Sequence, residues 1–191
     1  KDKRLWKDSF PVKRQNNTTG EIYMNSYYHK KMVERSLISA GNNYRIKKAI
    51  NKARNGQEVT VAYLGGSVTL GFKAYGDKRY AIASYKYFKE KFAAGDNTRY
   101  INAGMNGVSS ILSLIRLEQD VLRFNPDIVF LEFSVNDIRD SIHREAFESL
   151  VVRLLEWESK PAVILLFLQT EGGYTCQGHM QVIGENYNLP M

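Results

Sequence analysis

Short apolar runs alternate with longer segments of helical periodicity along most of this chain. The apolar runs are rich in β-branched and aromatic residues and predict strands at 58–64, 98–103, 127–134 and 162–168. Apolar positions spaced at three and four residues predict helices at 46–55, 80–93, 109–123, 143–158 and 178–187. Regular alternation of strands with helices is typical of a parallel sheet that is covered by helices on both faces. The pattern therefore predicts an α/β fold.

The first 45 residues lack such a pattern. They are rich in Asn, Tyr, Lys and Thr, so we interpret 1–45 as an N-terminal arm or linker and 46–191 as one domain. We expect the arm's aromatic residues to pack against the domain, with a sugar-binding platform as the alternative. They are Trp6, Phe10, Tyr23, Tyr27 and Tyr28.

Composition indicates a soluble globular protein. Hydrophobic residues make up 43% of the chain, and the longest apolar run, 162–168, is far too short to span a bilayer. The net charge of +7 would suit acidic partners, but the basic residues are dispersed. The nearest cluster falls on one face of the helix at 46–55 and is interpreted as a solvated surface; it comprises Arg45, Lys47, Lys48, Lys52 and Arg54. We therefore expect neither a nucleic acid nor a membrane as partner.

The single cysteine, Cys176, permits no internal disulfide and has no metal-ligand spacing around it. We interpret it as an unreactive loop thiol. Nothing in the sequence calls for a metal or an organic cofactor.

Three of the predicted strands end in glycines and small polar residues. The first runs into Gly-Gly-Ser-Val-Thr at 65–69, the second into Asn-Ala-Gly-Met-Asn-Gly at 102–107, and the third into Ser-Val-Asn-Asp at 134–137. The carboxyl ends of parallel strands meet at one edge of the sheet, where ligands bind. A serine nucleophile, a backbone N–H donor and a side-chain amide donor together make an oxyanion site. A simpler alternative for Ser67 is that it only caps the helix that follows.

These three segments resemble the motifs of the SGNH (GDSL-like) hydrolase family, in particular its carbohydrate-esterase-like branch, over about residues 46–191. The resemblance implies that Ser67 is the nucleophile and that the Gly107 N–H and the Asn136 amide stabilise the oxyanion. It also implies a three-layer α/β/α, flavodoxin-like fold with strand order 2-1-3-4 and a fifth strand to follow. The chain departs from the family at Gly66, where Asp is usual, and at Ser134, where Gly is usual.

The family's last motif, Asp-x-x-His, supplies the general base and has no convincing match. Asp140 and His143 have the spacing but follow the third strand, so we interpret them as exposed residues near a helix start. His179 follows the fourth strand without an Asp three positions earlier, and His29 lies in the arm, where we expect it on the surface.

We therefore expect the C-terminal strand and helix of the fold to be missing from this chain. The strand at 162–168 is apolar on both faces and would make a poor sheet edge, and 189–191 resemble the start of a strand that covers it. A complementary C-terminal piece of the same protein would then supply the base, and the 191-residue chain alone is expected to be inactive.

The sequence thus predicts a serine esterase that removes acetyl groups from a polysaccharide or another carbohydrate ester. A lipid or thioester hydrolase with the same site is one alternative, and a non-catalytic glycan-binding module is another. The basic chain and this substrate class suggest a secreted or cell-surface bacterial protein, with a cytoplasmic location as the alternative.

Overall fold

The computed structural model describes residues 26–191, except for the side chains of 26–29 and 77. The chain divides into two units, residues 1–38 and 39–191. In the first, the described element is α1 (Ser26–Ser36), a helix that the sequence pattern did not predict. The arm's five aromatic side chains and the His29 side chain lie outside the described part, so their predicted positions stay predictions.

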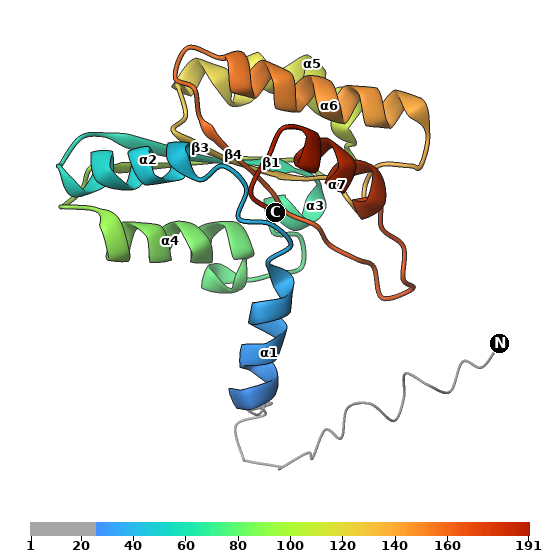
Figure 1. Ribbon diagram of the computed structural model, residues 1–191, viewed down its shortest axis with the longest axis horizontal. Coiled ribbons are helices and arrows are strands. Elements are labelled where there is room, and N and C mark those ends of the chain that lie inside the picture. Colours follow the sequence, from blue (N-terminus) through green and yellow to red (C-terminus); the bar gives the residue numbers. More distant parts are fainter. Residues whose placement is uncertain (1–25) are drawn as a thin grey trace. The chain divides into compact units, whose positions relative to one another are not determined.

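The second unit contains a parallel sheet of four strands (Figure 1). The strands are β1 (Val59–Gly65), β2 (Thr98–Gly104), β3 (Ile128–Glu132) and β4 (Ala162–Leu165). Their order in the sheet is β2-β1-β3-β4, which confirms the predicted topology. The register places Gly65 opposite Gly104 on one side and opposite Glu132 on the other, so three strand ends meet at one edge.

The strands β3 and β4 are shorter than predicted, because beyond their ends the Ser134 side chain replaces the backbone hydrogen bonds between them. Past β3, the Ser134 hydroxyl accepts the Leu168 N–H at 2.6 Å and donates to the Leu168 carbonyl at 3.0 Å. The backbones of the two segments therefore separate while staying tied together. This shortens the predicted 127–134 and 162–168 runs to β3 and β4.

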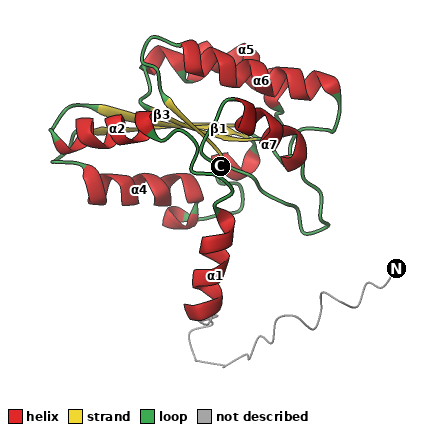
Figure 2. Cartoon of the chain, viewed as in Figure 1, coloured by secondary structure: helices red, strands yellow, loops and turns green. Residues whose placement is uncertain are grey.

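Helices cover both faces of the sheet (Figure 2). One face is covered by α2 (Tyr44–Arg54) and α4 (Tyr80–Phe92). The other is covered by α5 (Ser110–Asp120), α6 (Ser141–Glu156) and α7 (Gln177–Asn186). A single helical turn, α3 (Ser67–Leu70), follows β1, and 3₁₀ turns occur at Gly76–Lys78 and Leu122–Phe124. The three-layer α/β/α arrangement agrees with the predicted fold.

The central strand is buried on both sides, as expected for a parallel sheet. Along β1, Ala62 and Leu64 pack toward α5, α6 and α7, whereas Val61 and Tyr63 pack toward α2 and α4. These side chains form the two halves of the core, and they hold the carboxyl end of β1 in place.

The edge of β4 is bordered by the last three residues. The Leu165 N–H donates to the Pro190 carbonyl at 3.0 Å, and Met191 exchanges two backbone hydrogen bonds with Ser39 at 2.8 and 3.1 Å. Leu189, Pro190 and Met191 are buried. The segment expected to begin a further strand therefore does lie along β4.

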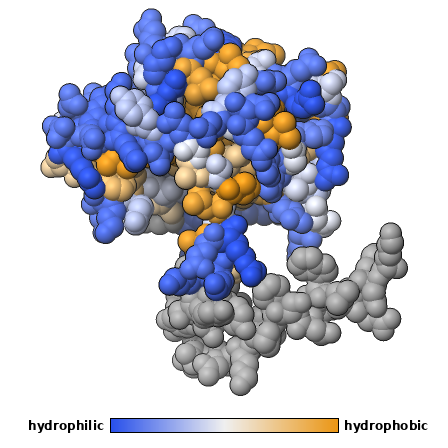
Figure 3. Space-filling view, in the orientation of Figure 1, coloured by the Kyte–Doolittle hydropathy of each residue, from blue (hydrophilic) through white to orange (hydrophobic). Residues whose placement is uncertain are grey.

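The basic face of α2 is largely solvated. Lys47, Lys48 and Arg54 are exposed, while Lys52 pairs with Asp127 at 2.8 Å. The face of the molecule seen in Figure 3 is mostly hydrophilic, with separate hydrophobic patches. Within the described residues, no helix combines the length and the apolar character needed to cross a membrane.

Candidate active site

The turn from β1 into α3 is built around two glycines that leave no room for side chains. A methyl group at Gly66 would lie 2.3 Å from Asn136 Oδ1, and one at Gly65 would lie 2.1 Å from Thr69 Oγ1. Both positions therefore need glycine for the close approach of neighbouring segments. The Asp that is usual in the family at position 66 would collide with the Asn136 side chain. Because Gly66 has no side chain, the Asn136 carboxamide lies directly against the backbone that precedes Ser67.

Ser67 is the first residue of α3 and is partly exposed. Neither its hydroxyl nor its N–H makes a hydrogen bond with any described residue. The hydroxyl does not cap α3, because the capping position is occupied by Gly66. The helix-capping alternative for Ser67 is therefore not supported.

Asn136 follows β3 in the loop that leads to α6. Its Oδ1 is buried without a partner among the described residues, and its carboxamide makes no hydrogen bond with any of them. The cap of α6 is Asp140, which accepts the His143 N–H at 2.8 Å. The Asn136 amide thus lies beside Gly66, the residue before Ser67, and its N–H donors have no partner among the described residues.

Gly107 lies in the exposed loop after β2 and has a φ of 69°, a conformation that favours glycine. The loop begins beside the turn that carries Ser67, because the Met105 N–H donates to the Gly65 carbonyl at 3.2 Å. The Gly107 N–H donates to no acceptor in the described part of the chain. Asn136 thus lies against Gly66, the residue before Ser67, and Gly107 follows in the loop whose start is hydrogen-bonded to Gly65.

His143 is paired with Asp140 rather than with the predicted nucleophile. Its Nδ1 lies 2.8 Å from Asp140 Oδ1, and its side chain is only 15% exposed. Hydrogen bonds from the His143 backbone and ring lower the pKa of Asp140. The prediction that both residues are exposed is wrong for His143, because the start of α6 folds its ring back onto the capping carboxylate.

No base contacts Ser67 among the described residues. His179 lies on α7, and its backbone N–H donates to the Cys176 carbonyl at 3.1 Å. Neither ring of His143 or His179 is bonded to the Ser67 hydroxyl.

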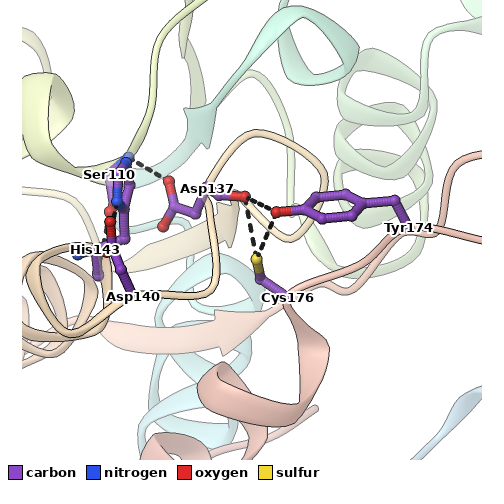
Figure 4. Close-up of polar contacts among 6 residues, drawn as sticks. All are labelled: Ser110, Asp137, Asp140, His143, Tyr174 and Cys176. Atoms are coloured by element: carbon purple, nitrogen blue, oxygen red, sulfur yellow. Dashed lines mark hydrogen bonds and ion pairs between the residues drawn. The ribbon is translucent and has the colours of Figure 1, made fainter.

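A polar cluster fixes the loop between β3 and α6 (Figure 4). Buried Asp137 accepts the Ser110 N–H at 2.8 Å, at the start of α5. The Asp137 carbonyl accepts hydrogen bonds from the Tyr174 hydroxyl at 2.7 Å and from Cys176 Sγ at 3.0 Å. Burial raises the pKa of the Asp137 carboxyl. Cys176 is therefore buried and hydrogen-bonded, while its lack of reactivity stays a prediction. Asn136 lies in a loop that is held from two sides.

The sequence analysis missed a buried carboxyl group beneath the turn. Glu132, the last residue of β3, is fully buried, and its Oε2 accepts a hydrogen bond from Thr69 Oγ1 at 3.2 Å. Burial raises the pKa of Glu132 to about 7, the hydrogen bond from Thr69 opposes this, and the charge of Asp137 adds to it. The sequence signal that could have identified this group is the single acidic residue at the end of the apolar run 128–131.

The raised pKa of Glu132 predicts a stability that falls with pH. Between pH 4.5, the group's ordinary pKa, and about 7, the folded protein keeps a proton that the unfolded chain has released. Wild-type stability should therefore decline across this range and level off above it. Glu132→Gln, which cannot ionise, should gain up to about 3 kcal/mol over wild type by pH 8 and almost nothing at pH 4.

Urea denaturation of both proteins from pH 4 to 8 measures this difference, with the same substitution at exposed Glu58 as the control. A difference between Glu132→Gln and wild type that does not change with pH would show that Glu132 does not titrate in this range.

Comparisons with known proteins identify solved structures that share this fold. No protein-family model and no curated protein sequence matches the chain. Among solved structures, a two-domain esterase (CEX) active on acetylated mannans is 35% identical, with a TM-score of 0.76 over 82% of this chain. AlinE4, an SGNH-hydrolase family esterase, is 20% identical with a TM-score of 0.56, and 70% of this chain is matched to 75% of that one.

Axe2, an acetylxylan esterase from Geobacillus stearothermophilus, is 15% identical with a TM-score of 0.52, and 71% of this chain covers 76% of that protein. The chain spans only 43% of the length of the two-domain esterase. The matches to AlinE4 and Axe2 establish the architecture alone. The match to the two-domain esterase, at 35% identity, shows that the similarity also extends to the amino-acid sequence. The chain has the fold of the SGNH hydrolases, in agreement with the family resemblance expected from its sequence.

Proposed function

We propose that the complete protein is a serine esterase in which Ser67 attacks the carbonyl carbon of an ester. The observation that carries this proposal is the uncommitted Asn136 carboxamide lying against Gly66, immediately before Ser67. A serine beside a free amide donor has the composition of an acyl-transfer site. A non-catalytic glycan-binding module would not require this pairing.

The proposed chemistry proceeds through a tetrahedral intermediate with a negative oxygen. The N–H groups of Ser67 and Gly107 and the Asn136 amide would donate hydrogen bonds to that oxygen. Each such donor typically contributes about 3 kcal/mol to lowering the barrier. All three donors lack an internal partner among the described residues, so binding the oxyanion would break no existing hydrogen bond.

The base that takes the Ser67 proton is proposed to come from a segment outside residues 1–191. Support comes from the His143 ring, which is hydrogen-bonded to Asp140, and from His179, which makes no hydrogen bond with Ser67. His143→Ala and His179→Ala should each leave more than about half of the activity of the complete protein. A loss of about 10³-fold in either variant would place the base inside this chain instead.

The proposed substrate is an acetylated polysaccharide. Support comes from the 35% identity to an esterase described as active on acetylated mannans. A polymer of this kind lies outside the cell, so the proposal includes a secreted or cell-surface location. A lipid or thioester hydrolase is the competing function and would favour long acyl chains.

Acyl-length profiling of the complete protein tests the proposed substrate. We expect kcat/KM for p-nitrophenyl acetate to exceed that for the octanoate by about 10-fold or more, because each extra methylene must fit a site shaped for acetyl. We also expect release of acetate from acetylated mannan. A preference for octanoate would favour the lipid hydrolase, and glycan binding without any hydrolysis would favour the binding module.

A further inference from the structure

Thr69 is the residue through which the Ser67 turn is fastened to the rest of the domain. It is fully buried two positions after Ser67. Its carbonyl accepts a hydrogen bond from Asn102 Nδ2 on β2 at 3.0 Å. Its hydroxyl is hydrogen-bonded to the Tyr80 hydroxyl on α4 at 2.8 Å and donates to Glu132 on β3 at 3.2 Å. One side chain and its carbonyl therefore link α3 to three other elements.

The turn depends on such links because it is too short to be stable alone. α3 has four residues, and an isolated helix of this length does not form in water. Its own backbone bonds, such as Leu70 N–H to the Gly66 carbonyl at 3.1 Å, close a single turn. The orientation of Ser67 must therefore be set by the contacts of the turn with its surroundings.

Glu132 is a costly group to bury for packing alone. Its side chain is fully buried, and its Oε1 has no hydrogen-bond partner among the described residues. A buried carboxyl with an unsatisfied oxygen destabilises the fold, and an apolar residue would avoid that cost. The other oxygen is bonded to Thr69. Burial of Glu132 thus lowers the stability of the fold, while its hydrogen bond fixes Thr69, which holds the Ser67 turn.

We propose that Glu132 and Tyr80 are positioning residues that act through the Thr69 hydroxyl to hold Ser67 in its reactive orientation. The inference rests on the proposed role of Ser67 as the nucleophile. The Thr69 hydroxyl donates to the Glu132 carboxyl group and is hydrogen-bonded to the Tyr80 hydroxyl, so these two partners together fix the rotamer of Thr69. Glu132 and Tyr80 are therefore assigned a role through Thr69 and not in the reaction itself.

Three substitutions and a matched control test this role. Thr69→Val removes the hydroxyl and keeps the shape, Thr69→Ser keeps the hydroxyl, and Tyr80→Phe removes the hydroxyl that is bonded to Thr69. Tyr85→Phe is the control: it removes a tyrosine hydroxyl from the same helix, but that hydroxyl is bonded to Thr98 at the start of β2.

Hydrogen exchange of the backbone amides in 66–72, followed by mass spectrometry, measures the local stability of the turn. This measurement does not require enzymatic activity. We expect exchange in Thr69→Val and Tyr80→Phe to be about 10-fold faster than in wild type, with Thr69→Ser and Tyr85→Phe unchanged. In the complete protein, kcat for p-nitrophenyl acetate should fall about 10- to 100-fold in Thr69→Val, with KM within about twofold.

The two readouts separate failure of this inference from failure of the proposed function. Unchanged exchange and kcat in Thr69→Val, or a Thr69→Ser variant as damaged as Thr69→Val, would overturn the positioning role. Equal changes in Tyr80→Phe and Tyr85→Phe would also overturn it, since both would then reflect general stability. If exchange changes as expected while Ser67→Ala keeps full esterase activity, the positioning of the turn stands and the assigned nucleophile is wrong.

Discussion

Ser67→Ala should lower kcat for ester hydrolysis by about 10⁴- to 10⁶-fold in the complete protein. Removal of the nucleophile leaves only oxyanion stabilisation and substrate binding, which account for a small part of the acceleration. The free energy of unfolding should change by less than about 0.5 kcal/mol, because the Ser67 hydroxyl is partly exposed and bonds to no described residue. Initial rates with p-nitrophenyl acetate and urea denaturation measure the two effects.

Ser141→Ala is a suitable control for this substitution. Ser141 is also the first residue of a helix, α6, and is exposed. It should retain wild-type kcat and stability. Substantial hydrolysis by Ser67→Ala would mean that another residue forms the acyl intermediate.

Asn136→Ala should lower kcat by about 10²- to 10³-fold and leave KM nearly unchanged. The expected loss is that of one oxyanion donor, about 3 kcal/mol in the transition state. The fold should be nearly intact, because the carboxamide has no hydrogen bond with a described residue to lose. Steady-state kinetics and thermal unfolding of the same preparation test both statements.

Asp140→Ala, in the same loop, should lower stability while leaving kcat nearly unchanged, which is the opposite of the effect expected for Asn136→Ala. Asp140 caps α6, so its loss should cost about 1 kcal/mol of stability. Its kcat should stay within a few-fold of wild type, since its carboxylate is bonded to His143 and not to Ser67. If the kcat loss in Asn136→Ala is matched by an equal loss in stability and is shared by Asp140→Ala, Asn136 has only a structural role.

Much of the fold was predictable because its determinants are local in the sequence. The apolar run before Gly65 has the β-branched and aromatic content of a buried strand, and the alternation of strands with helices predicted a parallel sheet. The ends of β3 and β4 were less predictable, because Ser134 replaces backbone pairing with side-chain hydrogen bonds to Leu168. The hydrophobic pattern of a sequence does not show where side-chain hydrogen bonds replace backbone pairing.

The site was only partly predictable for the same reason. Glycines at 65 and 66 signalled a tight turn, but the contact between Gly66 and Asn136 joins residues 70 positions apart. Glu132 and Thr69 are likewise 63 positions apart and meet only when β1 and β3 pair. Asp140 and His143 had the spacing of a catalytic pair, and only the three-dimensional arrangement shows that their hydrogen bond closes the start of α6.

The proposed nucleophile can be identified directly by reaction of the complete protein with a fluorophosphonate probe, followed by peptide mass spectrometry. The probe forms a stable adduct only with an activated serine whose oxyanion site accepts the phosphoryl oxygen. We expect one adduct, on Ser67, which is absent in Ser67→Ala and forms at least about 10-fold more slowly in Asn136→Ala. An adduct on a different residue, or ester hydrolysis by a protein whose Ser67 stays unmodified, would contradict the assignment of Ser67 as the nucleophile.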